Sequence, residues 1–263
     1  MTTLIGYAFI FIVSILGWRL RLLTGSGAIA ASIIGGSIYM SYSYTGLFLL
    51  GAFFGSSSFW SVYKRELKKK SQDKNAKSER RDWTQVFANG GAAALAAVLG
   101  AYFEGEIFFV AFTTALAAAN ADTWASEIGV LSKRKPFHLL RMKKVESGTS
   151  GAVSLLGFAA SFAGAFFIAI TAAFLYPSLS LTIIFIVCLL GFSGSVVDTI
   201  LGASIQVYYV CEVCGAETEK KVHCAEPTSR KGGFRFMNNE MVNFFSSFIV
   251  ALLIFILNGF GLF

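Results

Sequence analysis

Charged residues are scarce in this sequence, at 14% of 263 residues, whereas an ordinary soluble domain has about 25%. Only three prolines and four cysteines are present. So few prolines exclude a collagen-like chain, and so few cysteines exclude a fold that depends on many disulfide bonds. Apolar residues make up 55% of the chain and include 27 phenylalanines. Neither a soluble nor a disordered protein of this length accommodates so much apolar side chain, so the composition predicts an integral membrane protein.

The apolar residues form eight segments, which predict an all-α, polytopic bundle of about eight transmembrane helices in a single integral membrane domain, residues 1–263. Several segments are shorter than the ~20 residues of a straight span, so 28–42 and 106–130 are candidates for re-entrant or broken helices. The first segment lacks preceding basic residues and a following cleavage site, so we expect a retained helix rather than a signal peptide. The segments are 3–17, 28–42, 44–61, 85–103, 106–120, 153–176, 180–200 and 243–261.

Lysine and arginine are confined to four connections between these segments, and all four fall on one side if the segments cross the membrane in turn. The positive-inside rule assigns that side to the cytoplasm of a bacterial-type plasma membrane and places both termini outside. The outer connections carry Glu104 and Glu106 as their only charged residues. This placement of lysine and arginine explains the net charge of +7. We therefore do not expect a nucleic-acid partner. The most basic connection, 64–82, is expected to lie near anionic membrane lipids.

The last basic connection, residues 206–240, is long enough for a small folded element and contains a candidate zinc site. Cys211 and Cys214 have Cys-x2-Cys spacing, and His223 and Cys224 follow them. Thiolate and imidazole groups at such spacing are typical of structural Zn²⁺ sites, and disulfide bonds are not expected in a cytoplasmic loop. The adjacent residues His223 and Cys224 can both bind only if the backbone turns there, and unmetallated thiols are the alternative.

Three carboxylates, Asp122, Glu127 and Asp198, lie in or at the edge of apolar segments that contain no lysine or arginine. A charge inside a membrane is costly, so such residues usually face a wet cavity or a partner. A bound Mg²⁺ or a shared proton would meet this requirement, and helix-end acids held by solvent and loop lysines are the alternative. On one regular helix, Glu127 shares a face with Asn120 and points about 140° away from Asp122. Either the helix unwinds near Asp122, or the two acids act separately.

A glycine- and hydroxyl-rich loop, residues 147–151, immediately precedes the segment at 153–176. Backbone N–H groups at the start of a helix bind phosphate, and nearby lysines would assist. Helix capping is the alternative role of the hydroxyl groups. The candidate phosphate-binding residues are Lys143, Lys144, Gly148, Thr149, Ser150 and Gly151.

Two further pairs of polar residues lie at the start of apolar segments. Gln85 and Asn89 form a stripe that could orient a polar headgroup, and interhelical hydrogen bonding is the alternative. Asn239 and Asn243 lie about one helical turn apart in a polar cluster before the last segment, where helix capping is the alternative role of Asn239.

These residues occur in an order that resembles a known membrane family. The strings are Asn120-Ala-Asp122-Thr-Trp-Ala-Ser-Glu127-Ile-Gly129, Gly148-Thr-Ser-Gly151, Gly194-Ser-Val-Val-Asp198 and Gly202-Ala-x-x-Gln206, together with the Cys-x2-Cys. Over roughly residues 20–245 they resemble the domain-of-unknown-function-92 family, the group of transmembrane protein nineteen and the plant phytyl-phosphate kinase. The resemblance implies a kinase that converts a prenyl monophosphate to its diphosphate, with CTP or another nucleoside triphosphate as the donor.

The resemblance also assigns candidate site residues. The family often has two glycines where this chain has Gly151-Ala152, which is a departure at the glycine-rich loop. Residues that match the acidic motifs are Asn120, Asp122, Glu127 and Asp198, those that match the glycine-rich loop are Gly148 to Gly151, and those that match other polar positions are Arg81, Gln85, Asn89, Asn239 and Asn243.

We therefore expect a lipid kinase in which Asp122, Glu127 and Asp198 bind Mg²⁺. The acceptor phosphate is already anionic and needs no general base, in keeping with a chain whose only histidines are His138 and His223. A lipid or cation transporter or scramblase that uses the same carboxylates is the alternative. A non-catalytic assembly factor whose zinc loop recruits a partner is a third hypothesis.

Overall fold

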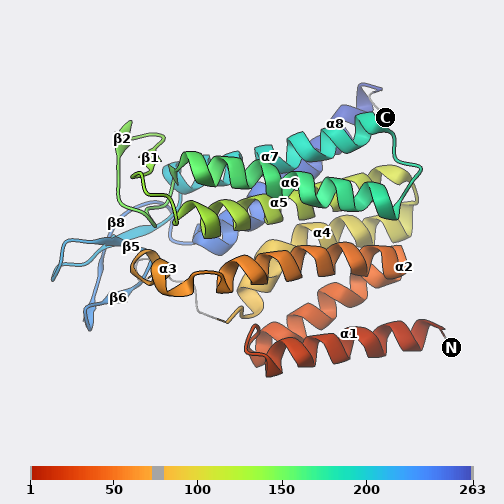
Figure 1. Cartoon of the computed structure of the whole chain (residues 1–263), viewed down its shortest axis with the longest axis horizontal. Helices are drawn as coiled ribbons and strands as arrows, with labels where there is room; N and C mark the ends of the chain where they lie inside the picture. Colours follow the sequence, from red (N-terminus) through yellow and green to blue (C-terminus); the bar gives the residue numbers. More distant parts are fainter. Residues whose placement is uncertain (1, 73–79, 262–263) are drawn as a thin grey trace.

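Helices form at every apolar segment of the sequence. The computed structural model describes residues 2–72 and 80–261, and within these residues it has eight helices (Figure 1). Of these, six are long and apolar enough to cross a membrane, and α1 is a shorter apolar helix. The helices are α1 (Thr2–Arg19), α2 (Gly25–Val62), α3 (Arg65–Gln72), α4 (Trp83–Phe103), α5 (Glu106–Gly129), α6 (Leu155–Leu175), α7 (Leu181–Ser204) and α8 (Asn239–Gly259). The expected polytopic helical bundle is confirmed.

The helical path is interrupted in α2 and not in α5. Ser43 has φ 50° and ψ −139°, which is outside the helical region, and α2 turns back on itself (Figure 1). Its two arms, 25–42 and 44–62, contain two of the eight apolar segments. In contrast, α5 is continuous over 24 residues, about 36 Å, which is enough to span a bilayer. The structure therefore shows no break within the helical part of 106–130.

The central helix of the bundle is α5, which packs against α2, α4, α6, α7 and α8. Every residue of α5 from Phe109 to Ala121 is buried. Small residues allow this close packing: a Cβ atom added to Gly194 of α7 would lie only 2.4 Å from the Cβ atom of Ala118. The contact between α7 and α5 is therefore close to a contact of bare backbones, which is how small residues pack helices within membranes.

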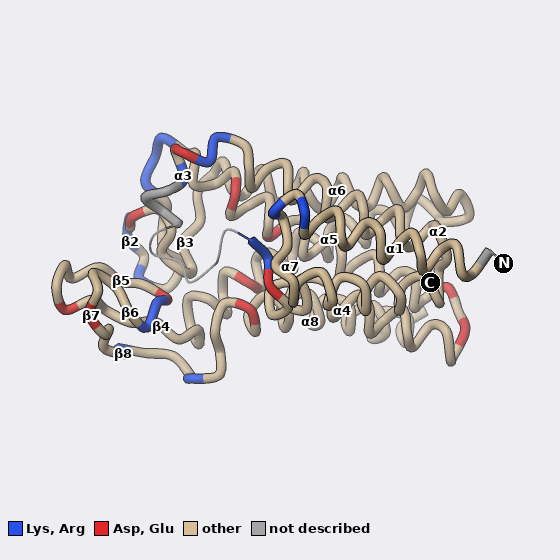
Figure 2. The backbone as a smooth tube through the Cα atoms, turned by 90° about the horizontal axis from the view of Figure 1, so that it is seen from below, with Lys and Arg blue, Asp and Glu red and all other residues tan. Residues whose placement is uncertain are grey.

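The basic residues gather at one end of the bundle. Figure 2 shows the described lysines and arginines toward the end where α3 and the strands lie, whereas the α4–α5 connection, with Glu104 and Glu106, lies at the opposite end. Both chain termini also lie toward that opposite end (Figure 1). Alternating membrane crossings predict this separation of charge. Within the basic connection 64–82, residues 73–79 lie outside the described residues.

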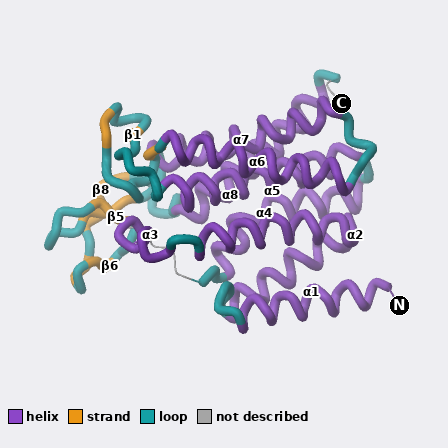
Figure 3. The backbone as a smooth tube through the Cα atoms, viewed as in Figure 1, coloured by secondary structure: helices purple, strands orange, loops and turns teal. Residues whose placement is uncertain are grey.

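Short strands occur outside the helices, at the basic end of the bundle (Figure 3). One antiparallel sheet has the order β2-β1-β3 and another has the order β5-β4-β8, while β6 and β7 form a hairpin. We call the two segments that contain them, 131–154 and 205–238, the polar cap. The strands are β1 (Phe137–His138), β2 (Lys143–Lys144), β3 (Ala152–Val153), β4 (Tyr208–Val210), β5 (Glu217–Thr218), β6 (Val222–His223), β7 (Glu226–Pro227) and β8 (Ser229–Gly232).

An ion pair joins the two segments of the polar cap. Nη1 of Arg141 donates to both carboxylate oxygens of Glu217, at 2.7 and 2.8 Å. The same guanidinium lies 5.7 Å from the ring centroid of Tyr208 on β4. Residues 131–154 and 205–238, which are far apart in the sequence, are thus joined at the end of the bundle.

The close packing of α7 on α5 can be tested with a glycine-to-alanine substitution. Gly194→Ala should lower the midpoint of thermal unfolding in detergent, because its methyl group would overlap with Ala118 and overpacking costs about 1–3 kcal/mol. Gly51→Ala is the matched control, since nothing lies within 4 Å of its added Cβ atom. Equal midpoints for the two variants would contradict this packing.

Candidate active site

A cavity of about 270 Å³ lies where α5, α6 and α7 meet the polar cap. Its volume is just below the usual range for small-molecule sites, roughly 300–1,000 Å³. Among the described residues that line it, three are carboxylates and none is a lysine or an arginine. The cavity is therefore acidic. Its polar lining residues are Asp122, Ser126, Ser147, Thr149, Ser150, Ser154, Ser161, Ser195, Asp198, Thr199, Glu219 and Asn239.

Asp198 is held in the cavity wall by the first turns of α8. The amide of Asn243, oriented with its nitrogen toward the carboxylate, donates to Oδ1 of Asp198 at 3.1 Å and to the backbone oxygen of Asn239 at 2.9 Å. The hydroxyl of Ser246 also donates to Oδ1 of Asp198, at 3.4 Å. Asn238 caps α8 by accepting from the backbone N–H of Met241 at 3.0 Å. The structure thus brings Asp198, Asn239 and Asn243 together.

The glycine-rich loop forms another wall of the cavity. Residues Gly148 to Gly151 all line it, and Gly151 has φ +74°. A Cβ atom on Gly151 would lie 2.4 Å from that of Ala203, so the loop lies directly on the end of α7. This close contact requires glycine, since other residues rarely adopt such a φ.

A hydrogen-bond network ties this loop to the second segment of the polar cap. The hydroxyl of Ser150 donates to Oε1 of Glu219 at 3.0 Å. The side-chain amide of Gln206 donates to the same oxygen at 2.8 Å and to the Ser150 hydroxyl at 3.1 Å. Glu219 is thus fixed beside the glycine-rich loop, in the cavity wall.

Several hydroxyl-bearing lining residues were not predicted from the sequence. Ser161 on α6 is only 2% exposed, and its hydroxyl has no hydrogen-bond partner among the described residues. The helical period could have indicated these residues. Ser161 lies two helical turns after Ser154, the N-cap of α6, and so shares its face of the helix. On α7, Ser195 and Thr199 lie on either side of Asp198 in the sequence and line the same cavity. A buried, unpartnered hydroxyl in a cavity wall is an available ligand atom.

Glu127 does not reach the cavity. Its carboxylate accepts from Nζ of Lys68 at 2.8 Å and from the hydroxyl of Ser61 at 2.9 Å. Lys68 is fully buried and also donates to the backbone oxygen of Trp60. Because α5 is a regular helix, Glu127 points about 140° away from Asp122, toward α2 and α3. The structure does not bring the three predicted magnesium ligands together; of these, only Asp122 and Asp198 line the cavity.

Asn120 also faces away from the cavity. It is fully buried, and its amide nitrogen donates to the backbone oxygen of Gly164 on α6 at 2.8 Å. Its carbonyl oxygen accepts from the hydroxyls of Ser56 and Ser57 on α2, at 3.1 and 3.3 Å. Asn120 therefore links three helices, and its hydrogen-bonding capacity is used for packing.

Five of the predicted substrate-binding residues outside the loop do not line the cavity. Lys143 and Lys144 are exposed on β2, at the edge of its sheet, and do not line the cavity. Burial lowers the pKa of Arg81 to about 10, and its guanidinium lies 5.2 Å from the ring centroid of Phe54. The remaining two, Gln85 and Asn89, bond to each other on α4, with the Asn89 amide donating to the Gln85 backbone oxygen at 2.8 Å.

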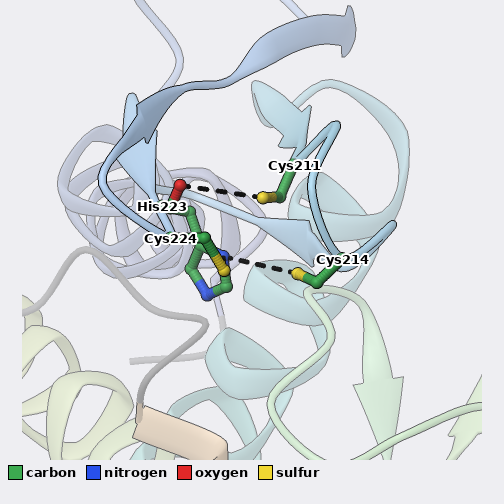
Figure 4. A group of neighbouring side chains, drawn as sticks. All are labelled: Cys211, Cys214, His223 and Cys224. Atoms are coloured by element: carbon green, nitrogen blue, oxygen red, sulfur yellow. Dashed lines mark hydrogen bonds between the residues drawn. The ribbon is translucent and has the colours of Figure 1, made fainter.

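The four predicted zinc ligands come together in the polar cap. Figure 4 shows Cys211, Cys214, His223 and Cys224 converging from two turns, and their ligand atoms all lie within 4.8 Å of one another. A hydrogen bond from the backbone of Cys214 lowers the pKa of Cys211 to about 6, whereas hydrogen bonding with Cys214 raises that of Cys224 to about 11.

Comparison with known proteins places this site in a family. The family model described as "Integral membrane protein DUF92" matches residues 8–251. The chain is a member of the DUF92 family. The matched range includes every residue that lines the cavity and all four candidate zinc ligands. Both sites therefore lie in the part of the chain that the family model describes.

Individual relatives of this DUF92 chain come from plants and archaea. The chain is 30% identical to Protein PGR of Arabidopsis thaliana, covering 84% of this chain and 85% of that protein. It is 26% identical to Protein VTE6, chloroplastic, of the same plant, covering 84% of this chain and 61% of the relative. It is 32% identical to an uncharacterised membrane protein of Methanocaldococcus jannaschii, covering 70% and 74%. No solved structure matches significantly.

The ion pair of Glu127 and Lys68 should matter for stability. Glu127→Gln and Lys68→Met should each lower the midpoint of thermal unfolding, because Lys68 is fully buried and Glu127 is partly buried. Removal of one partner from a fully buried pair costs about 3–5 kcal/mol, which is the upper bound here. The double variant should lose less than the sum of the two single losses. Lys144→Met, at an exposed position, is the control. Additive losses would show that the two side chains do not interact.

Proposed function

We propose that this DUF92 protein is a nucleoside-triphosphate-dependent kinase that phosphorylates a prenyl-type lipid monophosphate to its diphosphate. The donor is CTP or ATP. The observation that carries the proposal is the acidic cavity at the polar end of an apolar bundle, bounded by Asp122, Asp198 and the loop from Gly148 to Gly151. Such a position lets a lipid headgroup meet a water-soluble nucleotide while the lipid tail stays among the helices.

A divalent cation would allow a polyphosphate to bind in this acidic cavity. A polyphosphate would be repelled by Asp122, Asp198 and Glu219 unless a cation lay between them. Carboxylate and hydroxyl oxygens are the ligands that Mg²⁺ prefers, so this donor set fits the ion. Asp122 and Asp198 would hold it. The cavity wall also contains the Ser161 hydroxyl, which has no hydrogen-bond partner among the described residues. Bound Mg²⁺ supplies neutralisation of the charge on the transferred phosphoryl group.

The transfer itself needs little covalent chemistry from the protein. An oxygen of the acceptor phosphate forms a bond to the γ-phosphorus, the bond from that phosphorus to the β–γ bridging oxygen breaks, and the nucleoside diphosphate leaves with both electrons. The acceptor is already an anion, so no residue has to remove a proton. The glycine-rich loop would hold donor phosphates through its backbone N–H groups. Lys143 and Lys144, on the exposed edge strand, would at most attract the nucleotide electrostatically.

Aromatic side chains offer a place for the lipid tail. Phe158 lines the cavity and begins a stripe with Phe162 and Phe166 along the exposed face of α6. Phe192 of α7 packs edge-on against the first two, with ring centroids 4.8 and 5.8 Å apart. A prenyl chain lying along this stripe would keep its phosphate in the cavity.

The interior of the bundle favours a kinase over a transporter. A transporter needs a polar route through the membrane. Along α5, the buried run from Phe109 to Ala121 fills the bundle beyond the cavity. The two threonine hydroxyls in that run, Thr113 and Thr114, donate to backbone oxygens of their own helix.

Phosphoryl transfer provides the direct test. Asp122→Asn and Asp198→Asn should each reduce transfer of labelled γ-phosphate from CTP or ATP to a panel of prenyl monophosphates by about 100-fold or more, since metal and phosphate positioning supply most of the catalysis. Glu106→Gln, at the other end of the bundle, should keep the activity. Absence of labelled diphosphate from the unmodified protein would refute the kinase, and proton-coupled flux in liposomes without nucleotide consumption would indicate a transporter.

We further propose that the basic end, and with it the cavity, faces the cytoplasm, where nucleoside triphosphates are found, and that both termini lie outside. In a bacterial host, alkaline phosphatase fused to the C-terminus should be active, because it folds only outside the cytoplasm. A fusion after residue 215, within the polar cap, should be inactive. An inactive C-terminal fusion together with an active fusion after residue 215 would place the cavity outside the cytoplasm, away from nucleoside triphosphates, and would contradict the proposal.

A further inference from the structure

Two turns of the polar cap bring four metal-ligating side chains to one point. The first turn joins β4 to β5 and carries Cys211 and Cys214. It is closed by hydrogen bonds from the Gly215 N–H to the Cys211 oxygen at 2.8 Å and from the Cys211 N–H to the Ala216 oxygen at 3.0 Å. Gly215 has φ +72°. This backbone brings both sulfur atoms to the same side of the turn (Figure 4).

The second turn allows the adjacent residues His223 and Cys224 to face the same point. Neighbouring residues in an extended chain point in opposite directions, so His223 and Cys224 could not face one ion from a straight strand. The hairpin of β6 and β7 reverses directly after His223, with φ 52° at Cys224 and 63° at Ala225. Residues other than glycine or asparagine rarely adopt these angles. The turn aims both side chains at the Cys-x2-Cys (Figure 4).

Two of the separations between the ligand atoms are close to those around one tetrahedral ion, and all of them are within 4.8 Å. Nδ1 of His223 lies 3.5 Å from Sγ of Cys214 and 3.3 Å from Sγ of Cys224. Two ligands of one tetrahedral zinc, with bonds of about 2.3 Å to sulfur and about 2.1 Å to nitrogen, are about 3.6 Å apart. We propose that Cys211, Cys214, His223 and Cys224 bind one Zn²⁺. Because four protein ligands complete its coordination, the ion has a structural role.

The zinc site also positions a wall of the cavity. The chain between Cys214 and His223 contains β5 and Glu219, so the ion fixes both ends of the segment that carries Glu219. Glu219 in turn accepts from Ser150 of the glycine-rich loop at 3.0 Å and from Gln206 at 2.8 Å. Neither the metal site nor this coupling rests on the proposed kinase activity.

Metal content of the full-length protein, purified without a histidine tag, tests the site. Elemental mass spectrometry should find one zinc per chain. Cys211→Ser and Cys224→Ser should each lower the zinc content by about tenfold or more. Cys188→Ser is the matched control, because Cys188 is a buried thiol of α7, remote from the cap, and should leave the zinc content unchanged. Glu219→Gln should also retain zinc, since its carboxylate contacts Ser150 and Gln206.

Two measurements keep the test independent of how well the variants fold. Unmodified protein loaded with Co²⁺ should show the visible absorption of tetrahedral cobalt with thiolate ligands. Removal of zinc by a chelator should increase amide hydrogen exchange in residues 146–152 and 215–222, but not in α1. Protein without bound zinc and without the cobalt spectrum would overturn the metal site. Unchanged exchange at 146–152 after zinc removal would overturn its coupling to the cavity wall.

Discussion

A carboxylate placed within an apolar helical bundle depends on partners that the bundle itself supplies, because lipid supplies none. In this protein those partners come from different neighbours. Glu127 is held by Lys68 and Ser61 on the α2–α3 side, whereas Asp198 is held by Asn243 and Ser246 of α8. This requirement separates the polar residues into one set that holds helices together and another that lines a cavity. The proposed chemistry takes place at the second set.

The same packing that orders the bundle confines the cavity to one end. The residues of α5 from Phe109 to Ala121 are all buried, and within this run the Asn120 amide bonds to α6 and α2. Closer to the polar cap, Asp122, Ser161 and Asp198 line a common space. Phosphoryl transfer to a lipid suits this geometry, because its two substrates approach from different phases and need to meet at a boundary.

The polar cap that closes this space is small, and its strands have two to four residues each. Segments of this size bury too little apolar surface to be stable alone. Long-range polar contacts, such as Arg141 with Glu217, join its two halves. The proposed zinc ion would supply the remaining constraint, and through Glu219 it would act on the loop against which a nucleotide would lie.

Local patterns in the sequence determined the eight apolar segments, the gathering of basic residues at one end and the identity of the four candidate zinc ligands. Each depends on hydrophobicity or spacing over a short stretch. The helical period also showed that Asp122 and Glu127 could not share one ion on a regular helix. It did not show whether the helix unwinds near Asp122 or the two acids act separately. Only the tertiary structure decided that Asp122 faces the cavity while Glu127 meets Lys68, that Lys143 and Lys144 point outward, and that Ser161 and Glu219 line the wall. These outcomes depend on which helix packs beside which, and contacts between residues far apart in the chain leave no periodic trace in it.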